Sequence, residues 1–268
     1  MATNLEKAER FRALHVREGA FIIPNPWDAG SARLLEALGF EALATTSSGF
    51  AQSLGRLDGS VTLDEKAKHC RELASVTDIP ISADLENCFA DDPKKAASAI
   101  RIVADAGVVG ASIEDYSGSE IYDFHLAVER VHAAAEVAEG LEIPFTLTAR
   151  AENMLRGRYD LDDTIRRLQA FAEVGADVLY APGLKTMDEA RQVIQALEKP
   201  VNILAPFIRV VSFAELQDIG AKRISIGGAL ANACIGAMLR AGKEMLESGS
   251  FSWLSGMPVN GEIAGMLG

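Results

Sequence analysis

The sequence is poor in cysteine and in basic residues, and each shortage excludes a class of protein. Cys70, Cys88 and Cys234 are an odd number and form no CxxC pair, so neither a disulfide framework nor a thiolate zinc site is indicated. This usage favours a reducing, cytoplasmic location. The 26 Lys and Arg are outnumbered by 38 Asp and Glu, for a net charge of -12 and a pI of about 4.9. Because nucleic-acid affinity comes mainly from cations that neutralise phosphates, we expect no nucleic-acid partner.

Long hydrophobic runs are also missing. The longest uncharged run, Ile224 to Leu239, is shorter than the roughly 18 residues that a membrane-spanning helix needs. The first 19 residues carry charges throughout and lack the apolar core of a secretory signal, so we interpret them as a short amphipathic helix. We therefore expect no membrane partner.

What the sequence does contain is a regular alternation of short apolar runs and longer segments with helical periodicity, which is typical of βα units and a parallel sheet. We predict eight strands and eight following helices. The strands are expected at Ala20–Pro24, Ala42–Thr46, Ile81–Leu85, Gly110–Glu114, Phe145–Ala149, Val178–Ala181, Val201–Ala205 and Arg223–Gly227. The helices are expected at about 29–38, 64–76, 92–106, 122–139, 161–174, 187–197, 212–219 and 228–246.

Eight units in strict alternation can close into a barrel or spread into a doubly wound sheet. No GxGxxG motif opens a helix to favour the sheet, so we predict an α/β fold of the (β/α)8 TIM-barrel type. Four helices are expected to stop at a glycine, in LLEALGF, IVADAGV, FAEVGAD and LQDIGAK. A single domain would cover residues 1–268, with an N-terminal helix and a C-terminal helical tail at 247–268.

The predicted strand ends are rich in acidic residues, and in a barrel these ends form the active site. Asp84 and Glu86 are two apart in an extended segment, so both point to the same side of the strand, into the barrel mouth or away from it. Glu114 and Asp115 are adjacent, so at most one of them joins this site. For any one of these acids, the alternative is that it caps the next helix.

Converging carboxylates repel one another, and a bound divalent cation would relieve that repulsion. Oxygen ligands without histidine suit Mg²⁺, or Mn²⁺, rather than zinc. The four histidines all lie in predicted helices.

Arg150 follows the fifth strand and could clamp a substrate carboxylate, or form a salt bridge to Glu152 or Glu114 instead. The hydroxyls of TTSSGF, after the second strand, could donate to an enolate or carboxylate, although Ser and Gly there also fit an ordinary loop.

In combination these motifs resemble the isocitrate lyase/phosphoenolpyruvate mutase superfamily, from Ala20 to about Gly242. The matching pieces occur in family order: NPWDAGSARLLEALGFEALATTSSG, GRLDG, ISADLEN, ASIEDY, TLTARAE, VLYAPGL, PVNILA and RISIGGAL. The resemblance implies a magnesium-dependent enzyme that acts on a small 2-oxo acid or its enolate, as a lyase, mutase, hydrolase or decarboxylase.

The resemblance also implies roles for individual residues. Asp84 would hold the magnesium ion, while Asp58, Glu86 and Glu114 would bind its water ligands. Substrate would be bound by a set of six residues, of which Arg150 and Ser48 would act in catalysis together with Glu114. By the resemblance, four of them are Ser48, Gly49, Phe50 and Arg150. The other two, Tyr180 and Asn202, are included because they lie at the ends of the sixth and seventh predicted strands.

The chain departs from the family pattern at two places. The KKCGH or KRCGH loop of isocitrate and methylisocitrate lyases is missing, which argues against those two activities. Cys88 is not the cysteine of that loop, and we interpret it as structural. Tyr180 stands where phosphonate-active mutases tend to have histidine, which argues against phosphoenolpyruvate mutase itself.

Two other functions remain open from the sequence. One is a metal-free Schiff-base aldolase that uses Lys185, the only lysine near a strand end. The other is a non-catalytic barrel that binds a metabolite. Phe251, Trp253, Leu254 and Met257 load the tail with apolar surface, so we expect a homo-oligomer, and the resemblance suggests a tetramer.

Overall fold

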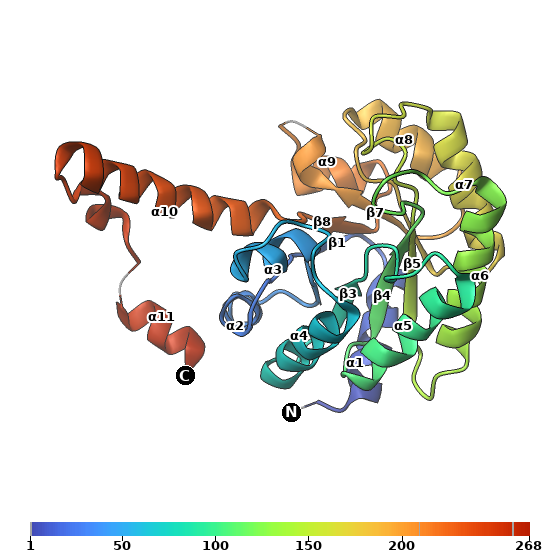
Figure 1. Ribbon diagram of the computed structural model, residues 1–268, viewed down its shortest axis with the longest axis horizontal. Helices are drawn as coiled ribbons and strands as arrows, with labels where there is room; N and C mark the ends of the chain where they lie inside the picture. Colours follow the sequence, from blue (N-terminus) through green and yellow to red (C-terminus); the bar gives the residue numbers. More distant parts are fainter. Residues whose placement is uncertain (1, 209, 259) are drawn as a thin grey trace.

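The computed structural model describes residues 2–208, 210–258 and 260–268, and these form a barrel of parallel strands surrounded by helices (Figure 1). The strands are β1 (Phe21–Ile23), β2 (Leu43–Ala44), β3 (Ile81–Asp84), β4 (Gly110–Glu114), β5 (Thr146–Arg150), β6 (Val178–Tyr180), β7 (Val201–Leu204) and β8 (Arg223–Ser225). The helices are α1 (Asn4–Val16), α2 (Ala29–Ala37), α3 (Ser47–Ser53), α4 (Leu63–Val76), α5 (Pro93–Asp105), α6 (Phe124–Glu139), α7 (Leu161–Glu173), α8 (Met187–Gln195), α9 (Phe213–Asp218), α10 (Ala229–Ser248) and α11 (Asn260–Leu267), with short 3-10 turns at Ala205–Phe207 and Ser252–Gly256.

The strands pair in the order β1-β8-β7-β6-β5-β4-β3-β2, and every pair is parallel. The seam between β1 and β2 is closed by fewer contacts. The Ala44 N–H donates to the Pro24 carbonyl at 3.1 Å. The Asn25 side chain donates to the Ala44 and Thr45 carbonyls and accepts from the Gly227 N–H at 2.8 Å. Asn25 therefore links the ends of β1, β2 and β8.

The predicted TIM barrel is confirmed, and each predicted strand and helix lies within two residues of the observed one. The four glycine stops are also confirmed, because Gly39, Gly107, Gly175 and Gly220 all have φ between 93° and 111°. One alternative was wrong, because the TTSSGF segment is not an ordinary loop: Thr46 is the N-cap of α3, which begins at Ser47.

The N-terminal helix α1 closes the bottom of the barrel, where the strands begin. Phe11 is fully buried there, in an apolar cluster with Phe21 and Ile23 of β1. Gly110, the first residue of β4, leaves room for this ring, since a Cβ at Gly110 would lie only 2.8 Å from Phe11 Cε1. Helix α1 and the Phe11 cluster thus form a plug that closes the N-terminal end of the barrel. The opposite end, where the strands stop, remains open for a binding site.

Beyond β8 the chain leaves the barrel. Helix α10 extends away from it, and α11 returns to pack near α2 (Figure 1). Among the described residues, no helix is both long enough and apolar enough to cross a membrane.

Candidate active site

A cavity of about 260 Å³ lies at the C-terminal ends of the barrel strands, the usual place for a barrel active site. Its walls come from all eight strands and the loops that follow them. The structure brings together most of the residues singled out in the sequence. Those in the lining are Ser48, Asp58, Asp84, Glu86, Glu114, Arg150, Tyr180 and Asn202.

Asp84, the last residue of β3, is held by hydrogen bonds and charges on both sides. Its Oδ2 accepts from the Ser47 N–H at 3.0 Å, and its Oδ1 lies 2.9 Å from Arg150 Nη1. Its own N–H donates to Thr45 Oγ1 at 2.8 Å. Burial raises the pKa of the carboxyl, but the charges of Arg150 and Lys66 and the Ser47 N–H together outweigh burial and keep the pKa below its usual value. Asp84 is therefore ionised and fixed in orientation.

Glu86 lies in the same cavity, but not for the reason predicted. Strand β3 ends at Asp84, and Glu86 has φ of 51°, so the two residues are not part of one extended segment. Cys88 and Phe89 also have positive φ, an unfavourable conformation for non-glycine residues that concentrates at functional sites. A left-handed turn, rather than strand alternation, directs Glu86 into the cavity.

The carboxyl of Glu86 is poorly compensated. Burial raises its pKa to about 7, helped by the nearby charges of Asp84 and of Asp58, which reaches the cavity from an exposed turn. Glu86 Oε1 is buried and has no hydrogen-bond partner in the described part of the chain. An unpaired buried acceptor of this kind is costly unless something binds it.

Glu114 and Asp115 point in opposite directions, as predicted. Glu114 ends β4 and faces the cavity, with Oε2 3.2 Å from Arg150 Nη2. Its burial raises the pKa well above the usual value. Asp115 lies behind the wall, where it accepts from the Glu152 N–H at 2.7 Å and pairs with Arg167 at 3.1 Å. Of these two neighbours, Glu114 lines the cavity with the other carboxylates and Asp115 does not.

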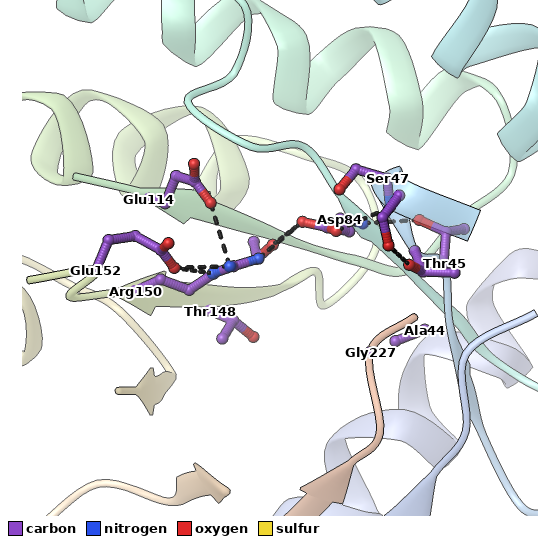
Figure 2. Close-up of polar contacts among 12 residues, drawn as sticks. Ala44, Thr45, Ser47, Asp84, Glu114, Thr148, Arg150, Glu152 and Gly227 are labelled. Atoms are coloured by element: carbon purple, nitrogen blue, oxygen red, sulfur yellow. Dashed lines mark hydrogen bonds and ion pairs between the residues drawn. The ribbon is translucent and has the colours of Figure 1, made fainter. Parts of the chain in front are cut away.

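Arg150 is the centre of the charged network (Figure 2). Its guanidinium contacts Asp84 at 2.9 Å, Glu114 at 3.2 Å and Glu152 at 2.6 Å, and it lies over the Tyr180 ring at 5.0 Å. Both salt bridges considered in the sequence are present, with Asp84 as a third partner. A clamp on a substrate carboxylate would have to exchange with one of these contacts.

Of the predicted Ser48–Phe50 contacts, only Ser48 lines the cavity. The Gly49 N–H donates to Thr46 Oγ1, the N-cap of α3, so it is already used. The Phe50 ring stacks on His69, with centroids 3.8 Å apart, and is not part of the lining. A Cβ at Gly49 would lie 2.6 Å from Thr46 Cγ2, so glycine is needed there for packing.

On the side of the cavity formed by β6 to β8, neutral polar side chains and one cation are joined by hydrogen bonds. Asn202 is fully buried and donates to Ser225 Oγ at 2.9 Å. Arg223 donates to Asn202 Oδ1 at 2.8 Å and to Thr148 Oγ1 at 3.0 Å. We did not predict a role for Arg223 or Ser225. A charged residue that alternates with serine in a buried strand was the available signal.

Glu152 and Arg156 form an ion pair next to Arg150 and extend the charged network of the cavity wall. Glu152 is fully buried and lies between two guanidinium groups, with Arg150 at 2.6 Å and Arg156 at 3.0 Å. Arg156 was missed in the sequence, although it follows Glu152 at helical spacing. It also stacks over the Tyr116 ring at 3.9 Å. These two residues support the cavity wall beside Arg150.

Two residues considered for chemistry lie outside the cavity lining. Cys88 is buried, which raises the pKa of its thiol to about 12. Lys185 is exposed and lies over the Tyr159 ring, with Nζ 3.8 Å from its centre. Neither residue is placed to react with a molecule in the cavity.

Comparison with known proteins gives a consistent group of relatives. Residues 11–246 match the family model described as phosphoenolpyruvate phosphomutase. A Burkholderia cenocepacia J2315 protein named in general terms as a lyase/mutase is 50% identical, with a TM-score of 0.95 over 97% of this chain and 95% of that one. The structure of 2,3-dimethylmalate lyase is 26% identical, with a TM-score of 0.85 over 100% and 96%. The 2-methylisocitrate lyase of Halalkalibacterium halodurans is 28% identical over 85% of this chain and 73% of its own length.

Proposed function

This chain belongs to the phosphoenolpyruvate mutase/isocitrate lyase superfamily, and on that premise we propose that it is a magnesium-dependent enzyme that breaks or forms a C–C or P–C bond in a small 2-oxo acid. One observation carries the proposal. Asp84, at the end of β3, lines one cavity together with Glu86, Glu114 and Asp58. Such a group of carboxylates is suited to a hard divalent cation.

The residues present fit a magnesium ion held largely through water. Glu86 Oε1 is a buried acceptor without a partner. In the described part of the chain, no three His, Cys, Asp or Glu side chains are arranged to hold an ion directly. Magnesium retains much of its water, so Asp84 would be its direct ligand, with Asp58, Glu86 and Glu114 binding through water. When bound, the ion would supply Lewis-acid stabilisation of developing negative charge, and Mn²⁺ could replace it.

The chain's own residues bind and orient the substrate. Ser48 belongs to the cavity lining, and its hydroxyl lies 3.2 Å from Thr46 Oγ1. Arg150 holds Asp84 and Glu114 in position and supplies positive charge next to the reacting group. Tyr180 contributes to the opposite wall. These groups would position a 2-oxo acid between an acidic side and a hydrogen-bonding side.

The decisive test is a screen of small 2-oxo acids and phosphonates with the purified protein and magnesium, following pyruvate and inorganic phosphate. We expect turnover of at least one compound, lost in EDTA and restored by added magnesium. Equal turnover in EDTA would contradict the metal assignment. Trapping of a pyruvate adduct by borohydride would instead favour a Schiff-base aldolase, and stabilisation by magnesium plus oxalate without any turnover would favour a binding protein.

We also propose a homo-oligomer, with a tetramer as the expected form. Leu246 of α10 is 89% exposed, and Met238, Leu239, Phe251 and Leu254 are also exposed. Apolar surface on a helix that projects from the barrel is typical of a subunit interface (Figure 1). Light scattering should give a mass of several subunits, and Leu246→Glu should lower it, whereas a wild-type monomer at micromolar concentration would contradict the proposal.

A further inference from the structure

Arg223 crosses the floor of the cavity. It begins β8, and its side chain reaches Thr148 Oγ1 on β5, across the barrel interior, at 3.0 Å. The residue is 5% exposed and belongs to the cavity lining. Burial lowers its pKa to about 10, so the guanidinium is still charged at neutral pH.

The charge of Arg223 has no counter-ion in the described part of the chain. Its two hydrogen-bond acceptors, Asn202 and Thr148, are neutral, and its Nη1 is buried with no partner. The buried Arg167 differs, because it pairs with Asp115 and Asp163. A buried charge is costly unless it is paired. An anion that enters the cavity would provide the missing compensation.

A directional chain of hydrogen bonds runs from Arg223 to the cavity. Arg223 Nε donates to Asn202 Oδ1 at 2.8 Å, which directs the amide nitrogen of Asn202 toward Ser225 Oγ, 2.9 Å away. Ser225 Oγ accepts this bond, so its own proton points to another acceptor, which is the Tyr180 hydroxyl in the same cavity lining or an anion that takes its place. Successive hydrogen bonds in one direction polarise each other. The chain therefore ends at a hydroxyl of the cavity lining whose donor strength depends on a buried cation.

The cavity is thus divided by charge. Its acidic side comes from the ends of β3 and β4, whereas the Arg223 chain lies on β7 and β8, on the opposite side of the barrel. Arg150 cannot provide the same free charge, because it already contacts three carboxylates.

We propose that the floor between β7 and β8 binds an anionic group of the substrate, a carboxylate or a phosphonate, through the Ser225 hydroxyl, and that Arg223 is the positioning residue that orients and charges this donor. The inference rests on the proposed function, since it concerns the same cavity. Arg223 acts through Asn202 and Ser225 and balances the charge of the bound anion. Arg223 should therefore contribute to the affinity for the anion and not to the stability of the free protein.

The test compares stability with anion affinity. We would measure the melting temperature of the free protein, and by calorimetry the Kd of oxalate and of phosphonoformate with magnesium. Arg223→Gln should weaken anion binding by at least about tenfold, the scale of a charge-assisted hydrogen bond. It should not lower the melting temperature of the free protein, because it removes an unpaired buried charge. Arg223→Lys should recover part of the affinity.

Ser225→Ala removes the terminal donor and leaves Arg223 in place. If Arg223→Gln does not fold, Ser225→Ala still tests whether this hydroxyl binds the anion. It should also weaken binding, by about fivefold or more. Exposed Arg71→Gln makes the same change in net charge and should bind as wild type. The anion that loses more affinity in the variants identifies the group bound at the floor.

The outcomes separate this inference from the proposed function. Wild-type affinity in both Arg223→Gln and Ser225→Ala would overturn the inference alone. A lower melting temperature of Arg223→Gln with unchanged affinity would make Arg223 structural, which also overturns it. If the wild-type protein binds neither anion with magnesium, the proposed function fails, and this inference fails with it.

Discussion

Arg150 Nη1 lies 2.9 Å from Asp84 Oδ1, so the residue predicted to bind the substrate is ion-paired with the residue predicted to bind the metal. The same guanidinium contacts Glu114 and Glu152 (Figure 2). A cation beside Asp84 would compete with Arg150 for the carboxylate and free an N–H group for the substrate. Binding of the metal and binding of the substrate are therefore expected to be coupled.

Loss of Asp84 should have the most severe effect on activity. As the proposed direct ligand, it is needed for Lewis-acid stabilisation, and its removal should cost on the order of a thousandfold or more in turnover. Glu86→Gln should cost less, because an amide can still orient a water molecule. Activity measured against magnesium concentration for Asp84→Ala, Glu86→Gln and wild type tests this, with circular dichroism as the folding control. Full magnesium-dependent activity in Asp84→Ala would show that the metal assignment is wrong.

Glu152→Gln should destabilise the protein. Glu152 is fully buried between Arg150 and Arg156, and loss of its charge leaves both guanidinium groups less compensated. Breaking a buried ion pair typically costs about 3–5 kcal/mol. Urea unfolding of Glu152→Gln and of the exposed control Glu198→Gln would measure the difference. Equal stability of the two variants would mean that Asp84 and Glu114 suffice to balance the network.

Cys88→Ser should retain most of the activity. The thiol is outside the cavity lining, and burial raises its pKa to about 12, so little thiolate forms at neutral pH. Iodoacetamide should modify the exposed Cys234 of the native protein and leave Cys88 unmodified. A hundredfold loss of turnover in a folded, metal-binding Cys88→Ser protein would overturn this interpretation.

Acid should destabilise the protein partly through His15. Burial lowers the pKa of His15 to about 3, whereas the unfolded chain has a value of about 6.5. The unfolded state therefore binds the proton first, and the free energy of unfolding should fall as the pH drops from 6.5 toward 3. His15→Phe should make this decline shallower by up to about 1.4 kcal/mol per pH unit. Urea unfolding between pH 7.5 and 4 tests this, with exposed His125→Gln as the control, and parallel profiles for wild type and His15→Phe would contradict it.

Gly110→Ala should destabilise the plug at the bottom of the barrel. The new methyl group would lie 2.8 Å from both Phe11 Cε1 and the Thr146 carbonyl oxygen. Overpacking of this kind costs about 1–3 kcal/mol. Phe11→Leu in the same chain should recover part of the loss, which a double-mutant cycle would measure. Additive effects of the two substitutions would show that the ring does not set the limit at Gly110.

Local sequence pattern determined much of the architecture. Strands, helices and glycine stops depend on periodicity and backbone preference, which act over a few residues. Every predicted strand, helix and glycine stop was confirmed, although helix α3 was not predicted. The order of the strands around the barrel brings their ends together, so acids at successive ends could be placed in one cavity. The opposite directions of Glu114 and Asp115 follow from strand geometry alone.

Only the tertiary structure decided how the site is assembled. Glu86 enters the cavity through a left-handed turn, and the partners of Arg150 depend on which carboxylates three different strands bring within reach. Arg223 belongs to the site because its side chain crosses the barrel to Thr148, a contact between residues 75 positions apart. Such contacts are set by side-chain packing and by the pairing of charges in a buried space. The local sequence can indicate that a residue such as Arg223 is unusual in a buried strand, but it does not determine which distant residues that side chain contacts.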